Sequence, residues 1–385
     1  MMNSQFTRRT RLIYTLAFSF ALTAAPSEGQ DRGFSNDYSG ESYGRTRVCD
    51  VIHVKLEPVI DMKDGRIDGV VTTTISPIYE HLREVYFDAV DMEILSVALS
   101  SGIDLDYRYA DNLLTVLLNR TFHVTDTFDI VVAYSAHPKM GLYFVRPDDG
   151  YPDKPWQVWS QGEMDESSHW FPCWDYPNDR ATSEIIVTVR KGMRAIANGA
   201  LISAEIDGQS GETTYHWREN VPHVTYLTSL IIGEYHETRT EWDGIPITYY
   251  VNPSDKKFVD LAFGKTPDMM DFFSNKIGVR YPYEKYAQTC VHDFIWGGME
   301  NISATTMTRR MLHDERAEVD YQTDGLVAHE LAHQWWGDLL TTKNWNNTWL
   351  NEGFASYFDL LYTEHARGNG EFKMRLRTFR ASYMN

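Results

Sequence analysis

The chain has 385 residues, 43% of them hydrophobic, and a formal net charge of −18. The hydrophobic content excludes a wholly disordered protein, and the length allows about two domains with cores of their own. The acidic charge argues against a nucleic-acid-binding protein, because the sequence contains no basic stripe that would neutralise phosphate groups.

The first residues have the pattern of a secretory signal peptide. Arg8, Arg9 and Arg11 precede an apolar run from Leu12 to Ala25, and proline, serine and glycine follow it. The run holds about 14 residues, whereas a membrane-spanning helix needs about 20. We therefore expect residues 1–29 to be a signal peptide, and the protein to be exported to the periplasm or the extracellular space without a stable membrane span.

Residues 47–252 are predicted to form a β-rich amino-terminal domain, after a polar linker over residues 30–46. From Ile52 to Leu56, apolar residues alternate with polar ones, which is the period of a half-buried strand. The other strand-like segments are FDIVVAYSA (128–136), SEIIVTVR (183–190), YLTSLIIGEY (226–235) and IPITYYVN (245–252). Asp-Gly pairs at 64–65, 207–208 and 243–244 predict turns between such segments.

After the strand-rich part the hydrophobic period changes, and residues 253–385 are predicted to form a mainly helical domain. Thr266–Asp268 has the pattern of an N-cap, a first-turn proline and a first-turn acid, and this helix should end at Gly278. Two further helices are expected at 324–336 and 348–367, each followed by a glycine. The predicted fold class is α+β, with the β-rich domain first.

The second of these helices carries two histidines four residues apart, in the segment VAHELAH. Four residues turn a helix by about 400°, so His329 and His333 lie about 40° apart on one face and can reach one zinc ion. Glu330 would then point toward the open side of the metal, where it can accept a proton from a bound water. The alternative is a pair of buried histidines on an ordinary helix.

A third metal ligand is predicted in WLNEGFASYF, residues 349–358. Glu352 stands in the first turn of the third helix, and an antiparallel return of this helix would bring it back to the histidines. Two histidines and a carboxylate, with water in the fourth position, make a hydrolytic zinc site. Alone, Glu352 would be read as an acid that complements a helix dipole.

The segment WGGMEN, residues 296–301, offers a candidate substrate site. Gly297 and Gly298 allow a close approach to the backbone, so a substrate could add its chain as an extra strand. Glu300 places a carboxylate beside this backbone. Without the metal motif, the segment would be read as a glycine-containing turn.

Together these motifs resemble the zinc aminopeptidases of the aminopeptidase N family, also called peptidase family M-one. The resemblance rests on HELAH, on Glu352 after eighteen intervening residues, on GGMEN, and on YPYEKY at 281–286. A further segment, SQGEMDESSHWFPCWDYP at 160–177, resembles an earlier substrate-binding segment of that family and contains Glu163. The alternative for Glu163 is a solvated surface charge.

The resemblance implies the role of each site residue. His329, His333 and Glu352 would bind one Zn²⁺, and Glu330 would be the general base. The substrate would be bound by Glu163, Gly297, Gly298, Met299 and Glu300. The two acids of this set would hold the α-ammonium group of a peptide with a free amino terminus, because converging carboxylates favour a cation.

The resemblance also implies a saddle-like amino-terminal domain and a thermolysin-like catalytic domain, with the catalytic domain incomplete at its carboxy end. Family members stabilise the oxyanion with a tyrosine roughly sixty residues after the zinc glutamate, which places it beyond residue 385. The side chain of Trp296 either narrows the first specificity pocket or packs in the core.

The sequence therefore predicts an exported zinc aminopeptidase, which hydrolyses the amino-terminal residue of peptides by attack of a zinc-bound water with Glu330 as base. One alternative is a zinc endopeptidase with the same metal site. The other is a non-catalytic, peptide-binding relative, against which the intact base beside the metal ligands argues.

Overall fold

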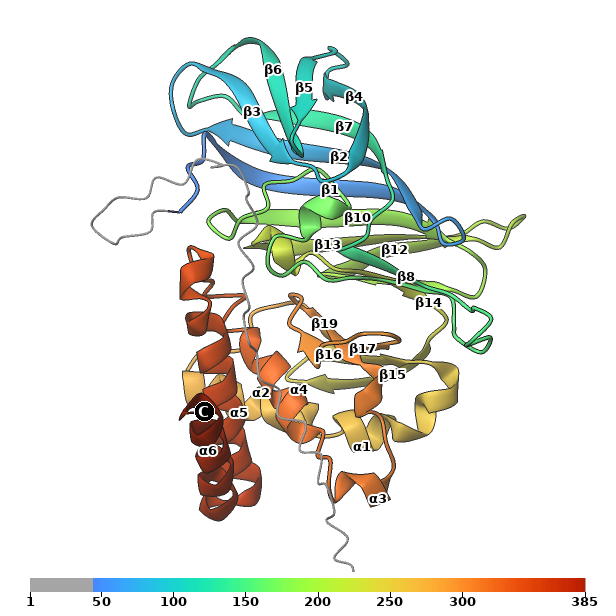
Figure 1. Cartoon of the computed structure of the whole chain (residues 1–385), viewed down its shortest axis with the longest axis vertical. Helices are drawn as coiled ribbons and strands as arrows, with labels where there is room; N and C mark the ends of the chain where they lie inside the picture. Colours follow the sequence, from blue (N-terminus) through green and yellow to red (C-terminus); the bar gives the residue numbers. More distant parts are fainter. Residues whose placement is uncertain (1–43, 385) are drawn as a thin grey trace, which may run out of the picture.

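The computed structural model describes residues 44–384, and the predicted signal peptide and most of the predicted linker lie outside this range. No helix within it is both long enough and apolar enough to cross a membrane. Strands dominate the chain as far as Val251, and helices dominate the remainder (Figure 1). This order confirms the prediction of a β-rich part followed by a helical part.

The amino-terminal part is built on a long seven-stranded sheet. Its order is β12 (Ala200–Ile206), β13 (Thr213–His223), β10 (Ala181–Val189), β1 (Cys49–Asp61), β2 (Arg66–Pro77), β7 (Phe128–Ala136) and β4 (Met92–Leu99). Neighbouring strands are antiparallel except for β1 and β10, which are parallel. Most of its core residues belong to one large apolar cluster.

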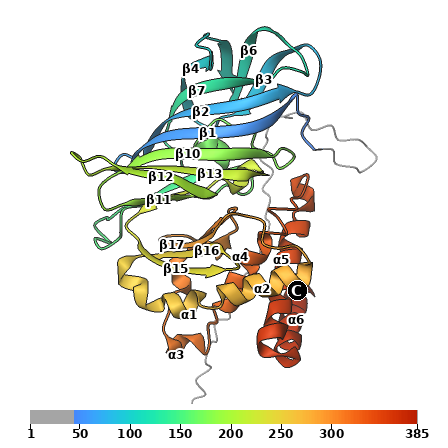
Figure 2. The same cartoon turned by 180° about the vertical axis from the view of Figure 1, so that it is seen from behind.

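Two smaller sheets complete this part. The three-stranded sheet lies at the far end in Figures 1 and 2 and has the order β3 (Leu82–Asp88), β6 (Leu113–Phe122), β5 (Asp106–Ala110). The four-stranded sheet has the order β11 (Arg194–Ala197), β14 (Leu230–Gly233), β9 (Gln157–Ser160), β8 (Leu142–Val145). Side chains of the four-stranded sheet, Trp159 and Ile231 among them, share a second core with the helical part.

Strand β1 differs from the predicted alternation. Val51 is buried, while Ile52 is 40% exposed, because the register between β1 and β2 shifts between Val51 and His53. Such a bulge adds one residue to the strand and reverses which side chains face the core. Strand β14 is also shorter than its predicted segment, since Thr225–Leu227 forms a 3₁₀ turn, η2, before the strand begins.

A five-stranded sheet supports the helical part. Its order is β15 (His236–Trp242), β16 (Ile245–Val251), β17 (Tyr286–Val291), β19 (Ala304–Thr308), β18 (Gly298–Met299). Asp243 and Gly244 join β15 to β16 with φ of 49° and 76°, the left-handed pair that a tight hairpin turn requires. Because β16 pairs with β17, this sheet continues across residue 252, where we placed the domain boundary; the domain division stays a prediction.

The helices are α1 (Val259–Phe263), α2 (Thr266–Ile277), α3 (Glu315–Glu318), α4 (Asp324–His333), α5 (Trp349–Arg367) and α6 (Asn369–Met384). In Figures 1 and 2, α5 and α6 run side by side along one flank of the helical part, and α4 lies next to them, toward the middle of this part. Short 3₁₀ turns at Ser167–His169 (η1), Pro253–Phe258 (η3), Arg309–Met311 (η4) and Trp345–Asn347 (η5) complete the secondary structure.

Two helix boundaries differ from the prediction. The predicted N-cap of α2 was wrong: the helix begins at Thr266, and the Thr266 hydroxyl donates a hydrogen bond to Gln288 Oε1, 2.9 Å away, instead of capping. Helix α4 ends at His333 rather than at residue 336, because the next residues tighten into a 3₁₀-type turn. At the other end of α2, Gly278 has φ of 79° and closes the helix as predicted.

Candidate metal centre and amine-binding acids

Helices α4 and α5 carry the three predicted metal ligands and pack against each other. Within α4, four apolar residues (Val327, Ala328, Leu331 and Ala332) are fully buried in the core. His329 and His333 lie on the side of α4 that meets the first turn of α5, where Glu352 stands. The packing of one buried apolar face therefore aims both imidazoles at the same carboxylate.

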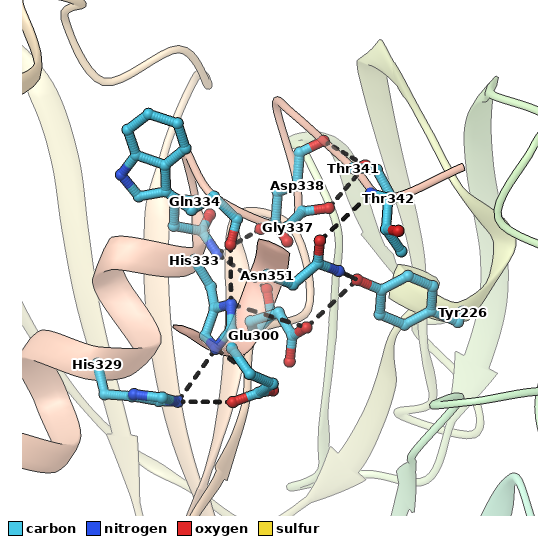
Figure 3. Close-up of polar contacts among 12 residues, drawn as sticks. Tyr226, Glu300, His329, His333, Gln334, Gly337, Asp338, Thr341, Thr342 and Asn351 are labelled. Carbon is cyan, nitrogen blue, oxygen red and sulfur yellow. Dashed lines mark hydrogen bonds and ion pairs between the residues drawn. The ribbon is translucent and has the colours of Figure 1, made fainter. Parts of the chain in front are cut away.

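The three ligands converge on one point, and Figure 3 shows the two histidines side by side. The two Nε2 atoms of His329 and His333 are 3.1 Å apart, and Glu352 lies 3.4 Å from the first and 3.7 Å from the second. Two nitrogen ligands of a tetrahedral zinc ion, each about 2.05 Å from the metal, are about 3.3 Å apart. The spacing of the three donors therefore fits a metal ion such as Zn²⁺.

One histidine is fixed in the state that metal binding needs. His333 Nδ1 lies 2.9 Å from the carbonyl oxygen of Trp336. A carbonyl oxygen only accepts, so Nδ1 carries the hydrogen and Nε2 presents its lone pair to the site. The turn that ends α4 early is thus the turn that orients His333.

The site carries more negative than positive charge. Burial alone would lower the pKa of His329, but its hydrogen bond to Glu352 and the charges of Glu330 and Glu352 raise this pKa to about 9. Burial raises the pKa of Glu330 to about 8, with the charges of Glu300 and Glu352 acting in the same direction. A bound cation would offset this excess and favour the ionised carboxylates.

The glycine doublet leaves room for Glu330. A Cβ added to Gly298 would lie 2.3 Å from Glu330 Cδ, so the carboxyl group rests directly on the backbone of β18. Strand β18 is also the last strand of its sheet, and no described strand pairs with its outer edge. The structure thus adds a reason for Gly298 that the sequence interpretation did not contain: it makes space for the predicted base.

The substrate-binding residues predicted from the sequence come from two separate segments. Oxygen atoms of Glu163, Glu300 and Glu352 all lie within 4.8 Å of one another. Glu300 is 3% exposed, and Glu163, for which the alternative was a solvated surface charge, is partly buried; the binding roles of both acids stay predictions. Met299 is different, because its side chain is buried in the core and only its backbone lies on the edge of β18.

Three further residues hold Glu300 in place, and the sequence analysis did not identify them (Figure 3). Gln334 Nε2 donates to the Glu300 carbonyl oxygen and to Asp338 Oδ2, at 2.9 and 2.8 Å. The Tyr226 hydroxyl reaches Glu300 Oε1, and Asn351 reaches that hydroxyl, each at 3.3 Å. Gln334 follows the predicted ligand His333 and Asn351 precedes the predicted ligand Glu352, so their positions in the sequence offered a signal. No spacing in the sequence connects Tyr226 with Glu300.

Comparison with family models places both parts of the chain in one class of hydrolase. Residues 50–227 match the peptidase M1 N-terminal domain, and residues 261–384 match the peptidase family M1 domain. The chain therefore belongs to peptidase family M1, as the sequence motifs indicated. Membership of this family implies Zn²⁺ as the metal of the site.

Curated relatives and solved structures agree with this assignment. Glutamyl aminopeptidase of Sus scrofa is 36% identical over 211 residues, or 53% of this chain. Probable aminopeptidase 1 of Sulfurisphaera tokodaii is 30% identical over 279 residues, or 71% of this chain. The matched regions span only 22% and 34% of these relatives' lengths.

Among solved structures, an M1 zinc metallopeptidase from Deinococcus radiodurans matches with a TM-score of 0.72 and 25% identity, covering 85% of this chain and 73% of the other. A mutant of that peptidase bound to a Tyr-Ser-Ala substrate matches with a TM-score of 0.71, the same identity and the same coverage.

Proposed function

We propose that the protein is a zinc aminopeptidase that removes single residues from the free amino terminus of peptides. The observation that carries this proposal is the meeting of two sets of groups: a His329–His333–Glu352 ligand set, and a pair of acids, Glu163 and Glu300, within 4.8 Å of the ligand Glu352. A metal site alone supports a peptidase, whereas acids at one end of it select a cationic amino terminus.

The roles of the residues follow from their chemistry. His329, His333 and Glu352 would hold Zn²⁺, which would supply Lewis-acid chemistry toward a carbonyl group and a water. Glu330 accepts a proton from the attacking water and returns it to the departing amine. Glu163 and Glu300 hold the α-ammonium group, which places the first peptide bond of the substrate within reach of Glu330.

The backbone edge of β18 is proposed to bind the substrate's main chain. Gly297, Gly298 and Met299 contribute this edge, and an extended peptide can add to it as one more strand. Trp296 stands immediately before it and forms an aromatic cluster with Tyr143 and Phe294, their ring centroids 6.2 and 5.3 Å from its own.

We also propose that the protein is exported and that its two domains have the shapes found in the family. The arginine-flanked apolar run before residue 29 supports a cleaved signal peptide and a periplasmic or extracellular location. Amino-terminal sequencing of the mature protein tests this, and an intact Met1 would refute it. A saddle-like amino-terminal domain and a thermolysin-like catalytic domain are proposed from the family alone.

The test of the function compares two reporter peptides that differ only in acetylation of the amino terminus. With the zinc-loaded full-length protein, we expect the free peptide to lose its first residue and the acetylated peptide to react at least about a hundredfold more slowly. Equal rates would identify an endopeptidase. Peptide binding without turnover of either peptide would identify the non-catalytic, peptide-binding relative.

A further inference from the structure

Tyr226 lies between the groups that are proposed to recognise the substrate and the helix that carries a metal ligand. Its hydroxyl is 3.3 Å from Glu300 Oε1 and 3.3 Å from Asn351 Nδ2 (Figure 3). Asn351 immediately precedes the ligand Glu352 in the first turn of α5. One phenol from the amino-terminal part of the chain thus joins two segments of the helical part.

The direction of these hydrogen bonds is set by the far end of Asn351. Asn351 Oδ1 accepts a hydrogen bond from the Thr342 backbone N–H at 3.2 Å, so the atom that faces Tyr226 is the amide nitrogen, a donor. The Tyr226 oxygen therefore accepts from Asn351, and its own proton is directed to Glu300. A hydrogen bond to a carboxylate is stronger than one between neutral groups, which holds Glu300 in a single orientation.

The position of Tyr226 is itself rigidly held. Its side chain is 2% exposed, and its ring meets the edge of Trp345 with centroids 5.1 Å apart. Its carbonyl oxygen lies against Gly162, where an added Cβ would be 2.3 Å away. Gly162 precedes Glu163, so the backbone of Tyr226 supports one acid of the anchor while its hydroxyl holds the other.

The charges around Tyr226 keep its proton in place. Burial raises the pKa of this phenol well above its usual range, and the carboxylates of Glu300 and Asp338 raise it further. The hydroxyl thus remains a donor at every pH at which a peptidase works. Among the described residues, it provides the only hydrogen bond to the Glu300 carboxylate.

We propose that Tyr226 is a positioning residue that aims Glu300 at the substrate's α-ammonium group and fixes the distance between this anchor and the metal ligands through Asn351. The inference rests on the proposed aminopeptidase function. Tyr226 does not touch the metal ligands, so loss of its hydroxyl should weaken recognition of the amine and leave metal binding intact.

The test uses Tyr226→Phe in the full-length, zinc-loaded protein and a pair of hydroxamate inhibitors, an α-amino hydroxamate and the same molecule without its amino group. The inhibition constant of the amine-free compound divided by that of the α-amino hydroxamate measures how much the amine contributes to binding. We expect Tyr226→Phe to lower this ratio about tenfold or more, because one hydrogen bond to a charged group is lost. Zinc content and inhibition by the amine-free compound should stay at wild-type values.

The matched control is Tyr235→Phe, which removes the hydroxyl of another buried tyrosine. Tyr235 Oη has no hydrogen-bond partner among the described residues, so this variant should keep the wild-type ratio. A ratio within twofold of wild type in Tyr226→Phe would overturn the inference. A wild-type protein that cleaves peptides but shows no preference for the amine would instead refute the proposed function.

A second variant tests the route through Asn351. Asn351→Asp keeps an acceptor for the Thr342 N–H but replaces the donor that faces Tyr226 with a second acceptor, which competes with Glu300 for the phenol proton. We expect it to lower the inhibitor ratio in the wild-type background and to have no further effect in Tyr226→Phe. Equal losses in both backgrounds would show that Asn351 acts independently of Tyr226 and would overturn this part of the proposal.

Discussion

The proposed metal centre and the proposed amine anchor share one site but are built in different ways. His329, His333 and Glu352 stand on two helices that lie close together in the sequence and pack against each other. The two acids of the anchor come from opposite parts of the chain, Glu163 after β9 and Glu300 after β18. The proposed metal site thus depends on local helix geometry, whereas the proposed amine recognition depends on how the two parts of the chain meet.

The largest expected effect is the loss of a metal ligand. His333→Ala should lose zinc and all measurable turnover, because it removes one of three protein ligands and the imidazole that the Trp336 carbonyl orients. Metal analysis of the purified variant measures this. His365→Ala, a partly exposed histidine on α5 away from the metal ligands, is the control and should keep its zinc. Full zinc content in His333→Ala would break the assignment of the ligand set.

Glu330→Gln should separate chemistry from metal binding. The amide keeps the shape of the carboxyl group over Gly298 but cannot accept a proton from water, so turnover should fall by about 10² to 10⁴. Zinc content and peptide binding should remain. Turnover at the wild-type rate would remove Glu330 from the mechanism.

Glu300→Ala should damage the anchor and spare the metal. We expect KM to rise and kcat to fall together, with a combined loss of about a hundredfold, because a misplaced scissile bond reacts slowly. Glu284→Ala removes an exposed acid of the same charge and controls for the change in net charge. Loss of zinc in Glu300→Ala would show that the anchor and the metal ligands do not function independently.

The smallest expected effect concerns the support of α4. Asp324 forms ion pairs with Lys265 and Arg367, each at 2.6 Å. These ion pairs connect α4 to the start of α2 and to the end of α5. Burial opposes them, but these ion pairs lower the pKa of Asp324 below its usual value. A lowered folded-state pKa stabilises the fold at neutral pH, and this stabilisation is lost as the pH falls below about 4.

Thermal unfolding of Asp324→Asn therefore should show a loss of no more than about 1 kcal/mol at pH 7, and a difference from wild type that shrinks toward pH 3. Zinc affinity should not change, because the ion-pair partners of Asp324 are Lys265 and Arg367, and neither is a metal ligand. A stability difference that grew with acidity would contradict the sign of the pKa shift.

The arrangement of the proposed metal ligands could be predicted from the sequence because it depends on residues that are close together in the chain. The spacing of His329, His333 and Glu352 depends on helix periodicity and one return of the chain, and Gly278 and Gly368 marked helix ends with φ of 79° and 86°. The N-cap of α2 was mistaken because the Thr266 hydroxyl bonds to a residue on β17. Local helix and capping propensities cannot indicate a hydrogen-bond partner that lies twenty-two residues away in the sequence.

The anchor was only half predictable. Glu163 and Glu300 were found through family motifs, but their meeting depends on tertiary packing that no periodicity encodes. Tyr226 belongs to a segment that we interpreted as a simple strand, and the structure places it instead in the 3₁₀ turn before β14. The bulge in β1 is a similar case, since a single inserted residue reverses an alternation that looks regular in the sequence.

The five-stranded sheet has a consequence for exchanging segments between relatives. A crossover at residue 252 would take β16 from one parent and β17 from the other, so two strands from different proteins would have to pair. A crossover between Gly233 and His236 would keep every sheet intact. Such a chimaera would still take Glu163 and Tyr226 from one parent and Glu300 from the other, so its discrimination between free and blocked peptides would report how well the two parents' anchors match.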